Sequence, residues 1–201
     1  MPRPLGRRNP DYEEKREKLV QELADYVLRS ELKRPSFRQL AAAAQVSEPT
    51  LRHYFGDRDG AAADILRALG VRARPFIEAV AQPARSLGEA VDAYVALAKV
   101  GVAHGGFARA HAFGLVEGVA DERVGRVYLE ALLEPSLAAL EARLRPHVAD
   151  PAQARAAALL VFAPMLLAVI HQELLGGRET APLDLSALFD AIAALTRKGV
   201  G

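Results

Sequence analysis

The sequence predicts an all-α protein of about nine helices, and three observations lead to that prediction. Alanine is abundant, and it is the residue that loses least side-chain entropy in a helix. Apolar residues, which make up 51% of the 201-residue chain, recur mostly at helical spacing. Prolines and glycines interrupt these runs, and no segment alternates apolar and polar residues as a half-buried strand would. The length suits one large domain, or a small domain joined to a medium one.

Charge and cysteine content narrow the class of protein. The chain carries 26 Lys and Arg against 25 Asp and Glu, a net charge of +1. It has no cysteine, which excludes disulfides, thiolate zinc sites, Fe–S clusters and cysteine nucleophiles. Residues 1–10 lack the apolar segment of a signal peptide. The longest apolar run, Ala156 to Ile170, is shorter than the roughly 18 residues of a spanning helix, so we expect a cytoplasmic protein without membrane contact.

Helix-start signals divide the first sixty residues. Residues 1–10 are basic and rich in proline, and they are typical of a flexible arm. Apolar residues at helical spacing follow from Asp11, which can cap the first helix. Ser36 and Gln39 form a capping box for a second helix, and Ser47 caps a third, short one.

The rest of the chain is predicted to form longer helices. A fourth helix follows Asp57, and we expect Gly70 and Pro75 to bend or split it before Gln82. The later helices are expected at 86–104, 107–116, 121–146 with a kink at Pro135, 151–175 and 184–197. We place the domain boundary between residues 56 and 57, which gives domains 1–56 and 57–201.

The stretch 36–59 is the one segment in which the spacing of residues indicates a function. Two short helices joined by a tight turn near Gln45 form a helix-turn-helix, with the small Ala41 where they cross. Val46 and Leu51 fill the angle between the helices, and Phe55 closes its base. The residues left outward on the second helix are short or can form hydrogen bonds. Such a helix end can enter the major groove of DNA and meet phosphates with its N–H groups.

This segment resembles the DNA-binding domain of the tetracycline-repressor (TetR) family of transcriptional regulators. The family pattern is a helix rich in small residues, Ala-Gly-Val-Ser, a variable step, Thr-Leu-Tyr-x-His-Phe, and then a basic residue and an acid after a short turn. This chain has Ala-Gln-Val-Ser-Glu-Pro-Thr-Leu-Arg-His-Tyr-Phe at 44–55, followed by Arg58 and Asp59. The resemblance implies an N-terminal three-helix DNA-binding domain and a C-terminal helical domain for ligand binding and dimerisation.

The family's functional residues carry over to specific positions of this chain. Ser47 would cap the recognition helix and contact phosphate, and Arg58 would hold a phosphate from the start of the next helix. Tyr54 fits a core role and a phosphate contact equally well. The full set of predicted DNA-contacting residues is Arg38, Ser47, Glu48, Pro49, Thr50, Arg52, His53, Tyr54 and Arg58.

Three positions depart from the family pattern. Gln45 replaces the usual glycine, so we expect a non-glycine residue at positive φ, at a cost of order 1 kcal/mol. Arg52 replaces an aromatic residue and could reach a phosphate or read the edge of a guanine. Tyr54 replaces a histidine. These departures affect the expected base preference rather than the docking mode.

The resemblance also implies a homodimer formed by the helices at 151–175 and 184–197. The composition supports this independently, because the helix at 151–175 is apolar nearly all round and must be buried on more than one side. Central burial within a monomer is the alternative explanation. A two-fold dimer would read a palindromic operator in double-stranded DNA, with half-sites about one helical turn, roughly 34 Å, or a multiple of it apart.

A family member of this kind is expected to be a repressor that a small-molecule ligand, unknown here, releases from its operator. His104, His111 and Glu117 could suggest a metal site, but Gly105 and Gly106 interrupt the helical spacing, and we predict no metal and no cofactor. Aromatic residues at helical spacing are more often plain core than ligand contacts. With that alternative open, the candidate ligand-lining residues are Tyr94, His104, Phe107, His111, Phe113, Tyr128, Phe162, Met165 and Val169.

Other functional classes find little support. The sequence contains no H-E-x-x-H, no P-loop, no G-x-S-x-G and no dinucleotide-binding glycine motif, so we expect no enzyme. The remaining alternative is a helical interaction protein or ligand-binding module that does not bind DNA. The sequence thus predicts a sequence-specific DNA-binding transcriptional regulator.

Overall fold

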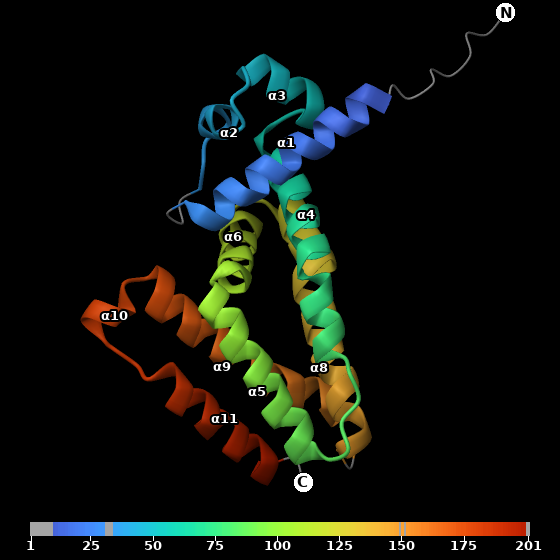
Figure 1. Cartoon of the computed structure of the whole chain (residues 1–201), viewed down its shortest axis with the longest axis vertical. Coiled ribbons are helices and arrows are strands. Elements are labelled where there is room, and N and C mark those ends of the chain that lie inside the picture. Colours follow the sequence, from blue (N-terminus) through green and yellow to red (C-terminus); the bar gives the residue numbers. More distant parts are fainter. Residues whose placement is uncertain (1–9, 31–33, 149, 151, 200–201) are drawn as a thin grey trace, which may run out of the picture.

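A computed structural model of the chain describes residues 10–30, 34–148, 150 and 152–199, and it is all-helical, without a strand, over those residues (Figure 1). The predicted basic arm, residues 1–10, lies almost entirely outside the described part. The helices are α1 (Pro10–Arg29), α2 (Phe37–Ala43), α3 (Glu48–Phe55), α4 (Arg58–Val80), α5 (Leu87–His104), α6 (Gly106–Ala120), α7 (Glu122–Tyr128), α8 (Glu134–Leu144), α9 (Gln153–Leu174), α10 (Gly177–Thr180) and α11 (Leu185–Gly199).

The predicted helix starts coincide with side-chain caps. Ser36 and Gln39 form the predicted capping box at α2. Asp57 and Ser86 accept backbone hydrogen bonds at the starts of α4 and α5. Asp121 accepts two at the start of α7. The predicted starts of these four helices are therefore confirmed.

Of the two expected effects of Gly70 and Pro75, a bend or a split, the split does not occur: α4 runs without a break from Arg58 to Val80. At Gly70 the absence of a side chain is required by packing, since a Cβ there would lie 2.2 Å from the carbonyl oxygen of Ala131. Buried Arg143 supports the far end of α4, donating hydrogen bonds to the carbonyls of Ala79 and Val80. Packing has therefore kept this helix whole where its sequence favoured a break.

The predicted irregularity at Pro135 is present as a π-helical turn, Leu129–Leu133, between α7 and α8. Proline cannot donate a hydrogen bond to the carbonyl four residues earlier, and its ring collides with that carbonyl in a regular helix. The wider turn relieves this conflict, and the backbone N–H of Glu134 donates to Leu129 instead. The irregular turn packs against α4.

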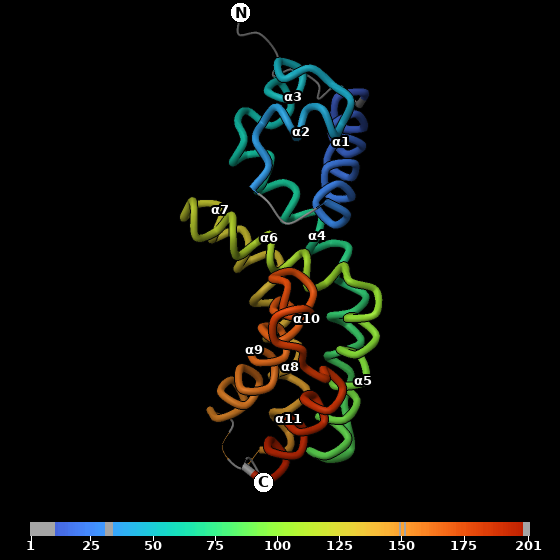
Figure 2. Tube along the Cα trace, turned by 90° about the vertical axis from the view of Figure 1, so that its left-hand side faces the viewer, coloured from blue at the N-terminus to red at the C-terminus, as the bar shows by residue number. Residues whose placement is uncertain are grey.

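Two hydrophobic clusters form the interior. The first joins α1–α3 and the first half of α4 to α6 and α7, through residues such as Leu51, Ile65 and Phe113. The second joins α5, α8, α9 and α11, with Val80 and Val161 among its members. α4 contributes to both clusters, and Figure 2 shows it passing from the N-terminal helices toward the opposite end of the molecule. The packing of the first cluster thus continues past residue 57, where we placed the domain boundary.

By length and composition alone, α9 could cross a membrane. The uninterrupted apolar run at 156–170 is shorter than a membrane span, so the sequence had not indicated this. However, 44% of its apolar window is buried inside the protein, and it packs against α8, α11 and α6. Core helices of globular proteins have the same composition. Burial within the fold therefore accounts for about half of its apolar surface.

Candidate nucleic-acid interface

α2 and α3 form a helix-turn-helix at one end of the molecule (Figure 1). Ala41 and Leu51 are buried between the helices, as the spacing predicted. The turn is closed by a backbone hydrogen bond of 3.0 Å from the Val46 N–H to the carbonyl of Ala41. α2 and α3 therefore pack as one rigid unit against α1 and α4.

Gln45 adopts φ of +54°, and it is the only non-glycine residue at positive φ in the described part of the chain. This confirms the expectation that the turn requires the left-handed conformation where a glycine would be usual. The conformation costs a side chain of this kind on the order of 1–2 kcal/mol. The turn is therefore formed in spite of a local preference against it, because α2 and α3 are held by their core contacts.

The first turn of α3 presents small polar groups to solvent. Ser47 Oγ accepts a 3.2 Å hydrogen bond from the Thr50 N–H and lies 2.8 Å from the Thr50 hydroxyl. Ser47, Pro49 and Thr50 are exposed, and Glu48 is half-buried. A helix start of this kind offers N–H groups and a positive dipole end to a phosphate, and hydroxyls to base edges.

The second half of α3 is held by aromatic contacts. The Arg52 guanidinium lies over the Phe37 ring, 5.3 Å from its centroid, and the side chain stays exposed. Tyr54 is half-buried, with its ring 4.9 Å from that of Tyr12 on α1. Exposed His53 meets the same Tyr12 ring edge-on at 5.4 Å. α1 thus fixes the orientation of α3, and Tyr54 takes the core role while its edge remains accessible.

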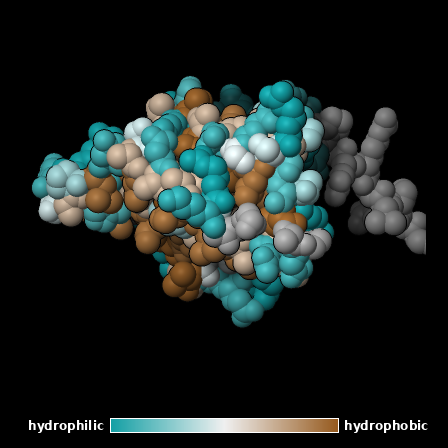
Figure 3. Space-filling view, turned by 90° about the horizontal axis from the view of Figure 1, so that it is seen from below, coloured by the Kyte–Doolittle hydropathy of each residue, from teal (hydrophilic) through white to brown (hydrophobic). Residues whose placement is uncertain are grey.

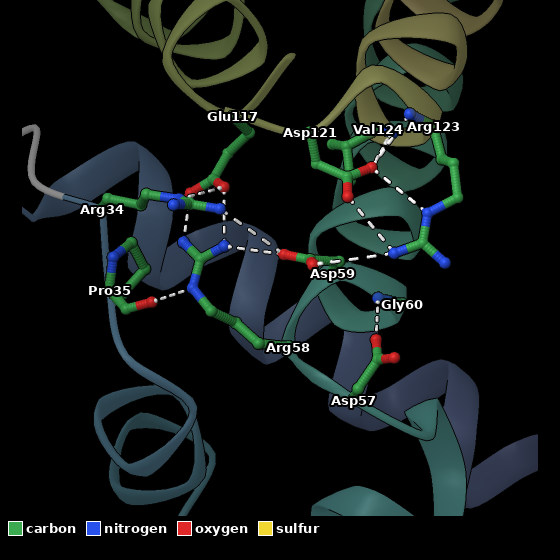
Figure 4. A network of polar contacts seen from close by, with 10 residues as sticks. All are labelled: Arg34, Pro35, Asp57, Arg58, Asp59, Gly60, Glu117, Asp121, Arg123 and Val124. Atoms are coloured by element: carbon green, nitrogen blue, oxygen red, sulfur yellow. Dashed lines mark hydrogen bonds and ion pairs between the residues drawn. The ribbon is translucent and has the colours of Figure 1, made fainter. Parts of the chain in front are cut away.

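Arg38 and Arg58, the two predicted phosphate ligands outside α3, have different surroundings. Arg38 is exposed on α2. Arg58 instead donates hydrogen bonds to Glu117 on α6, to Asp59 and to the carbonyl of Pro35 (Figure 4). The hydrogen bonds to Glu117 raise the pKa of Arg58 above its ordinary value. Arg58 thus joins α4 to α6, and its guanidinium is occupied by protein groups.

The ion pairs around Arg58 form a network that no motif of the sequence predicts. Glu117 is fully buried and also accepts a 3.2 Å hydrogen bond from Arg34. Asp59 pairs with Arg34 and, at 3.9 Å, with Arg123 at the start of α7. Figure 4 shows these side chains converging between the N-terminal helices and α6. No spacing signal could have identified Glu117, since its partners lie far away in the sequence.

The predicted ligand-lining residues are only partly brought together. Five of them line one small cavity of about 30 Å³: Tyr94, Phe107, Phe162, Met165 and Val169. His104 lines a larger neighbouring cavity of about 300 Å³, which Phe107 also borders. Phe76 on α4 lines both cavities, and Phe189 on α11 lines the small one; neither was among the residues predicted to line a ligand site.

Three predicted ligand-lining residues are core residues and border neither of these cavities. Phe113 and Tyr128 belong to the first hydrophobic cluster. His111 is fully buried, and its Nδ1 lies 2.9 Å from the Tyr128 hydroxyl, while its Nε2 has no hydrogen-bond partner among the described residues. Burial lowers the pKa of His111 to about 3, so the ring is neutral. In the described residues no three His, Asp or Glu side chains gather as metal ligands, and Glu117 is bound to two arginines.

Comparison with solved structures identifies the architecture. A TetR-family transcriptional regulator from Mesorhizobium loti superimposes with a TM-score of 0.66, at 17% identity, over 94% of this chain and 98% of its own. The chain has the TetR-family fold. The fatty acid degradation regulator FadR from Bacillus halodurans gives a TM-score of 0.57, at 17% identity, over 95% of this chain and 96% of its own. No protein-family model matches the sequence, and no curated protein matches it either. The TetR-family fold accounts for the whole described chain, with the helix-turn-helix at its N-terminal end.

Proposed function

We propose that the protein is a sequence-specific DNA-binding transcriptional regulator: a homodimeric repressor that acts in the cytoplasm and leaves its operator when a small molecule binds. The observation behind this proposal is the exposed polar first turn of α3 in a rigid helix-turn-helix. Thr50 and Arg52 are the residues best placed for base edges and phosphates, and Ser47 and Arg38 would position the duplex. We leave Arg58 out of the proposed contacts, since its donors are bound to Glu117.

Dimerisation would use the outward face of α9 together with α11. Leu160 and Leu167 on α9 are 67% and 65% exposed, and Leu195 on α11 is 70% exposed. Ala156, Leu160, Ala163 and Leu167 recur at spacings of four, three and four residues, so they form one apolar stripe on α9. Apolar side chains also reach the surface as brown patches on the face seen from below in Figure 3. A second copy of the same stripe would cover these leucines through two-fold symmetry.

Release from DNA would pass along α6. Its first turn carries Phe107 and Ala108, which line the small cavity, and its last turns carry Glu117, which holds Arg58 at the start of α4. α4 follows α3 directly, after Gly56 and Asp57. A ligand that displaced the start of α6 would therefore shift the recognition helix, and in a dimer it would change the distance between the two recognition helices.

Selection from random DNA followed by an electrophoretic shift assay tests the proposal. We expect enrichment of a palindrome and a binding constant that falls steeply with salt. Changing Thr50→Ala and Arg52→Ala together should abolish the shift, while the circular dichroism spectrum stays that of a folded helical protein. The control, Arg126→Ala, removes an exposed arginine on α7 and should leave binding intact. A chain that binds no DNA, but still binds a small molecule or a protein, would support the alternative of a helical interaction module.

A further inference from the structure

The two cavities next to α6 are separated by a pair of aromatic rings. Phe76 from α4 and Phe107 from α6 border both cavities, with ring centroids 5.0 Å apart. Gly101 on α5 also borders both, and a Cβ there would touch the Phe76 ring at 3.6 Å. Rotation of either ring would join the cavities into one channel running from α1 toward α11. Such a channel would accept a ligand longer than either cavity holds alone.

The larger cavity, of about 300 Å³, has a mostly apolar lining. Side chains such as Leu28, Leu69 and Val100 line it, and its two ionisable lining groups are Arg72 on α4 and His104 at the end of α5. No Asp or Glu is among its lining residues. An apolar wall with a few converging polar groups is the usual make-up of a small-molecule site. Here those polar groups are both basic, which favours an anionic group on the ligand.

His104 supplies a second polar side chain at this cavity. Its Nδ1 lies 2.8 Å from the carbonyl of Val100, one turn earlier, so Nδ1 carries a hydrogen and donates. Nε2 is then left for solvent or a ligand. The side chain is exposed, so an anion can reach it from solvent.

Arg72 ties the larger cavity to α1. Its Nη1 donates to Asp25 at 2.6 Å, its Nε donates to the Gln21 side chain at 2.8 Å, and its Nη2 donates to the Gln21 carbonyl at 3.1 Å. α1 in turn holds α3 through Tyr12. A carboxylate that pairs with Arg72 would compete with Asp25, because both would use the same fork of donors. Binding in this cavity would therefore loosen α1 as well as move α6.

We propose that the effector is an amphipathic carboxylate. Its head binds Arg72 and His104, and its apolar body passes between Phe76 and Phe107 toward Tyr94 and Phe162. The effect of this ligand on DNA binding rests on the proposed function, whereas the binding of the ligand does not. A cationic ligand would be repelled by the Arg72 guanidinium, and a neutral apolar one would leave the head of the site without a partner.

Calorimetric titration of the protein without DNA tests the ligand class. The probes are decanoate and 2-naphthoate, with decanol and decylamine as uncharged and cationic comparisons, all well below micelle-forming concentration. We expect a carboxylate to bind at least tenfold more tightly than decanol, and decylamine not to bind. Arg72→Gln should weaken carboxylate binding roughly tenfold or more, because a charge-assisted hydrogen bond is lost. Arg74→Gln, at an exposed arginine on the same helix but outside the cavity lining, should change nothing.

A second variant separates the proposed ligand binding by Arg72 from the ion pair that Arg72 forms with Asp25 on α1. Asp25→Asn breaks the ion pair on α1 but keeps Arg72, so carboxylates should bind as tightly as to the wild type, or more tightly. Equal affinity for decanol and decanoate, or unchanged affinity in Arg72→Gln, would overturn the proposal.

Adding the carboxylate that binds to the electrophoretic shift assay then tests whether it releases the protein from DNA. Carboxylate binding by a chain that binds no DNA would refute the proposed function alone, whereas DNA binding without any carboxylate binding would refute this inference alone.

Discussion

Arg58 donates to both carboxylate oxygens of Glu117, at 2.7 Å from Nη1 to Oε2 and 2.5 Å from Nη2 to Oε1. The pair joins the start of α4 to the end of α6. The carboxylate is fully buried, while the guanidinium side chain keeps 21% of its surface exposed. A buried charge without a partner is far more costly than a solvated one. The pair therefore fixes how the start of α4, and with it the preceding helix α3, sits relative to α6.

We predict that Glu117→Gln destabilises the protein by about 1–3 kcal/mol, because Arg58 and Arg34 lose their shared anion but keep contact with solvent. Urea unfolding measures the change. Combining it with Arg58→Gln in a double-mutant cycle should give a coupling energy above about 0.5 kcal/mol. The control, Glu122→Gln, removes an exposed glutamate paired one turn away with Arg126, and it should stay within about 0.5 kcal/mol of the wild type. A coupling energy of zero would contradict the assigned role of the pair.

Gln45→Gly should stabilise the protein by up to about 1 kcal/mol. Glycine adopts positive φ without steric cost, and this gain exceeds the extra entropy of the unfolded chain. The matched control is Ala42→Gly, at an exposed position of α2 with ordinary helical geometry, which should lose about 0.5–1 kcal/mol. Thermal or urea unfolding of both variants measures the two effects. Destabilisation by both substitutions would show that the side chain of Gln45 makes a stabilising contact.

His111 should make stability depend on pH. Burial lowers its folded-state pKa to about 3 from an ordinary value of 6.5, so the unfolded state takes up a proton first as pH falls. The stabilising contribution is complete above pH 6.5 and is lost progressively from there down to about 3. Between pH 6.5 and 5 the loss from this group is about 2 kcal/mol.

The variant His111→Gln removes that titration and keeps a polar partner for Tyr128. Unfolding free energies measured at pH 7.5 and pH 5 should therefore differ less in this variant than in the wild type. His53→Gln, at an exposed histidine, serves as the control. An unchanged pH dependence in His111→Gln would argue against the buried neutral ring.

Gly114→Ala should destabilise the fold by about 1–3 kcal/mol or more through overpacking. A Cβ at this position would lie 2.1 Å from the Tyr128 ring, so α6 and α7 would have to separate. The hydrogen bond between Tyr128 and His111 would be strained in the same movement. The comparison is Gly106→Ala, where a Cβ meets nothing within 4 Å, and which should not destabilise. Differential scanning calorimetry of the two variants gives the contrast directly.

Leu160→Glu combined with Leu167→Glu should convert the proposed dimer into a monomer. Two charges placed in an apolar two-fold interface face their own copies, which adds repulsion to the lost burial. Light scattering coupled to size exclusion measures the mass, and operator affinity should fall with it. The control, Val71→Glu, places a charge at an exposed apolar position on α4. A wild-type protein that is already monomeric would contradict the proposed interface.

Much of this fold could be predicted from local sequence. The caps at Ser36, Asp57 and Ser86 start helices where expected, because a side chain and a backbone N–H three residues later need no other part of the chain. The helix-turn-helix is local in the same sense, whereas the positive φ of Gln45 was predicted from the glycine usual at that position of the family pattern. Side chains at the outward positions of α3 were predictable for the same reason.

Tertiary packing decided the remaining features. Arg58 had the sequence signature of a phosphate ligand, yet its partner Glu117 lies 59 residues away and no periodicity connects them. Phe76 completes a cavity wall from another helix, and α4 continues through Pro75 without a break. The sequence by itself determined where helices begin and which face of α3 is polar, since those follow from contacts within one or two turns. Only the folded chain decided which charges are buried together and where cavities remain, because burial and pairing depend on groups that are distant in sequence and meet only when the helices pack.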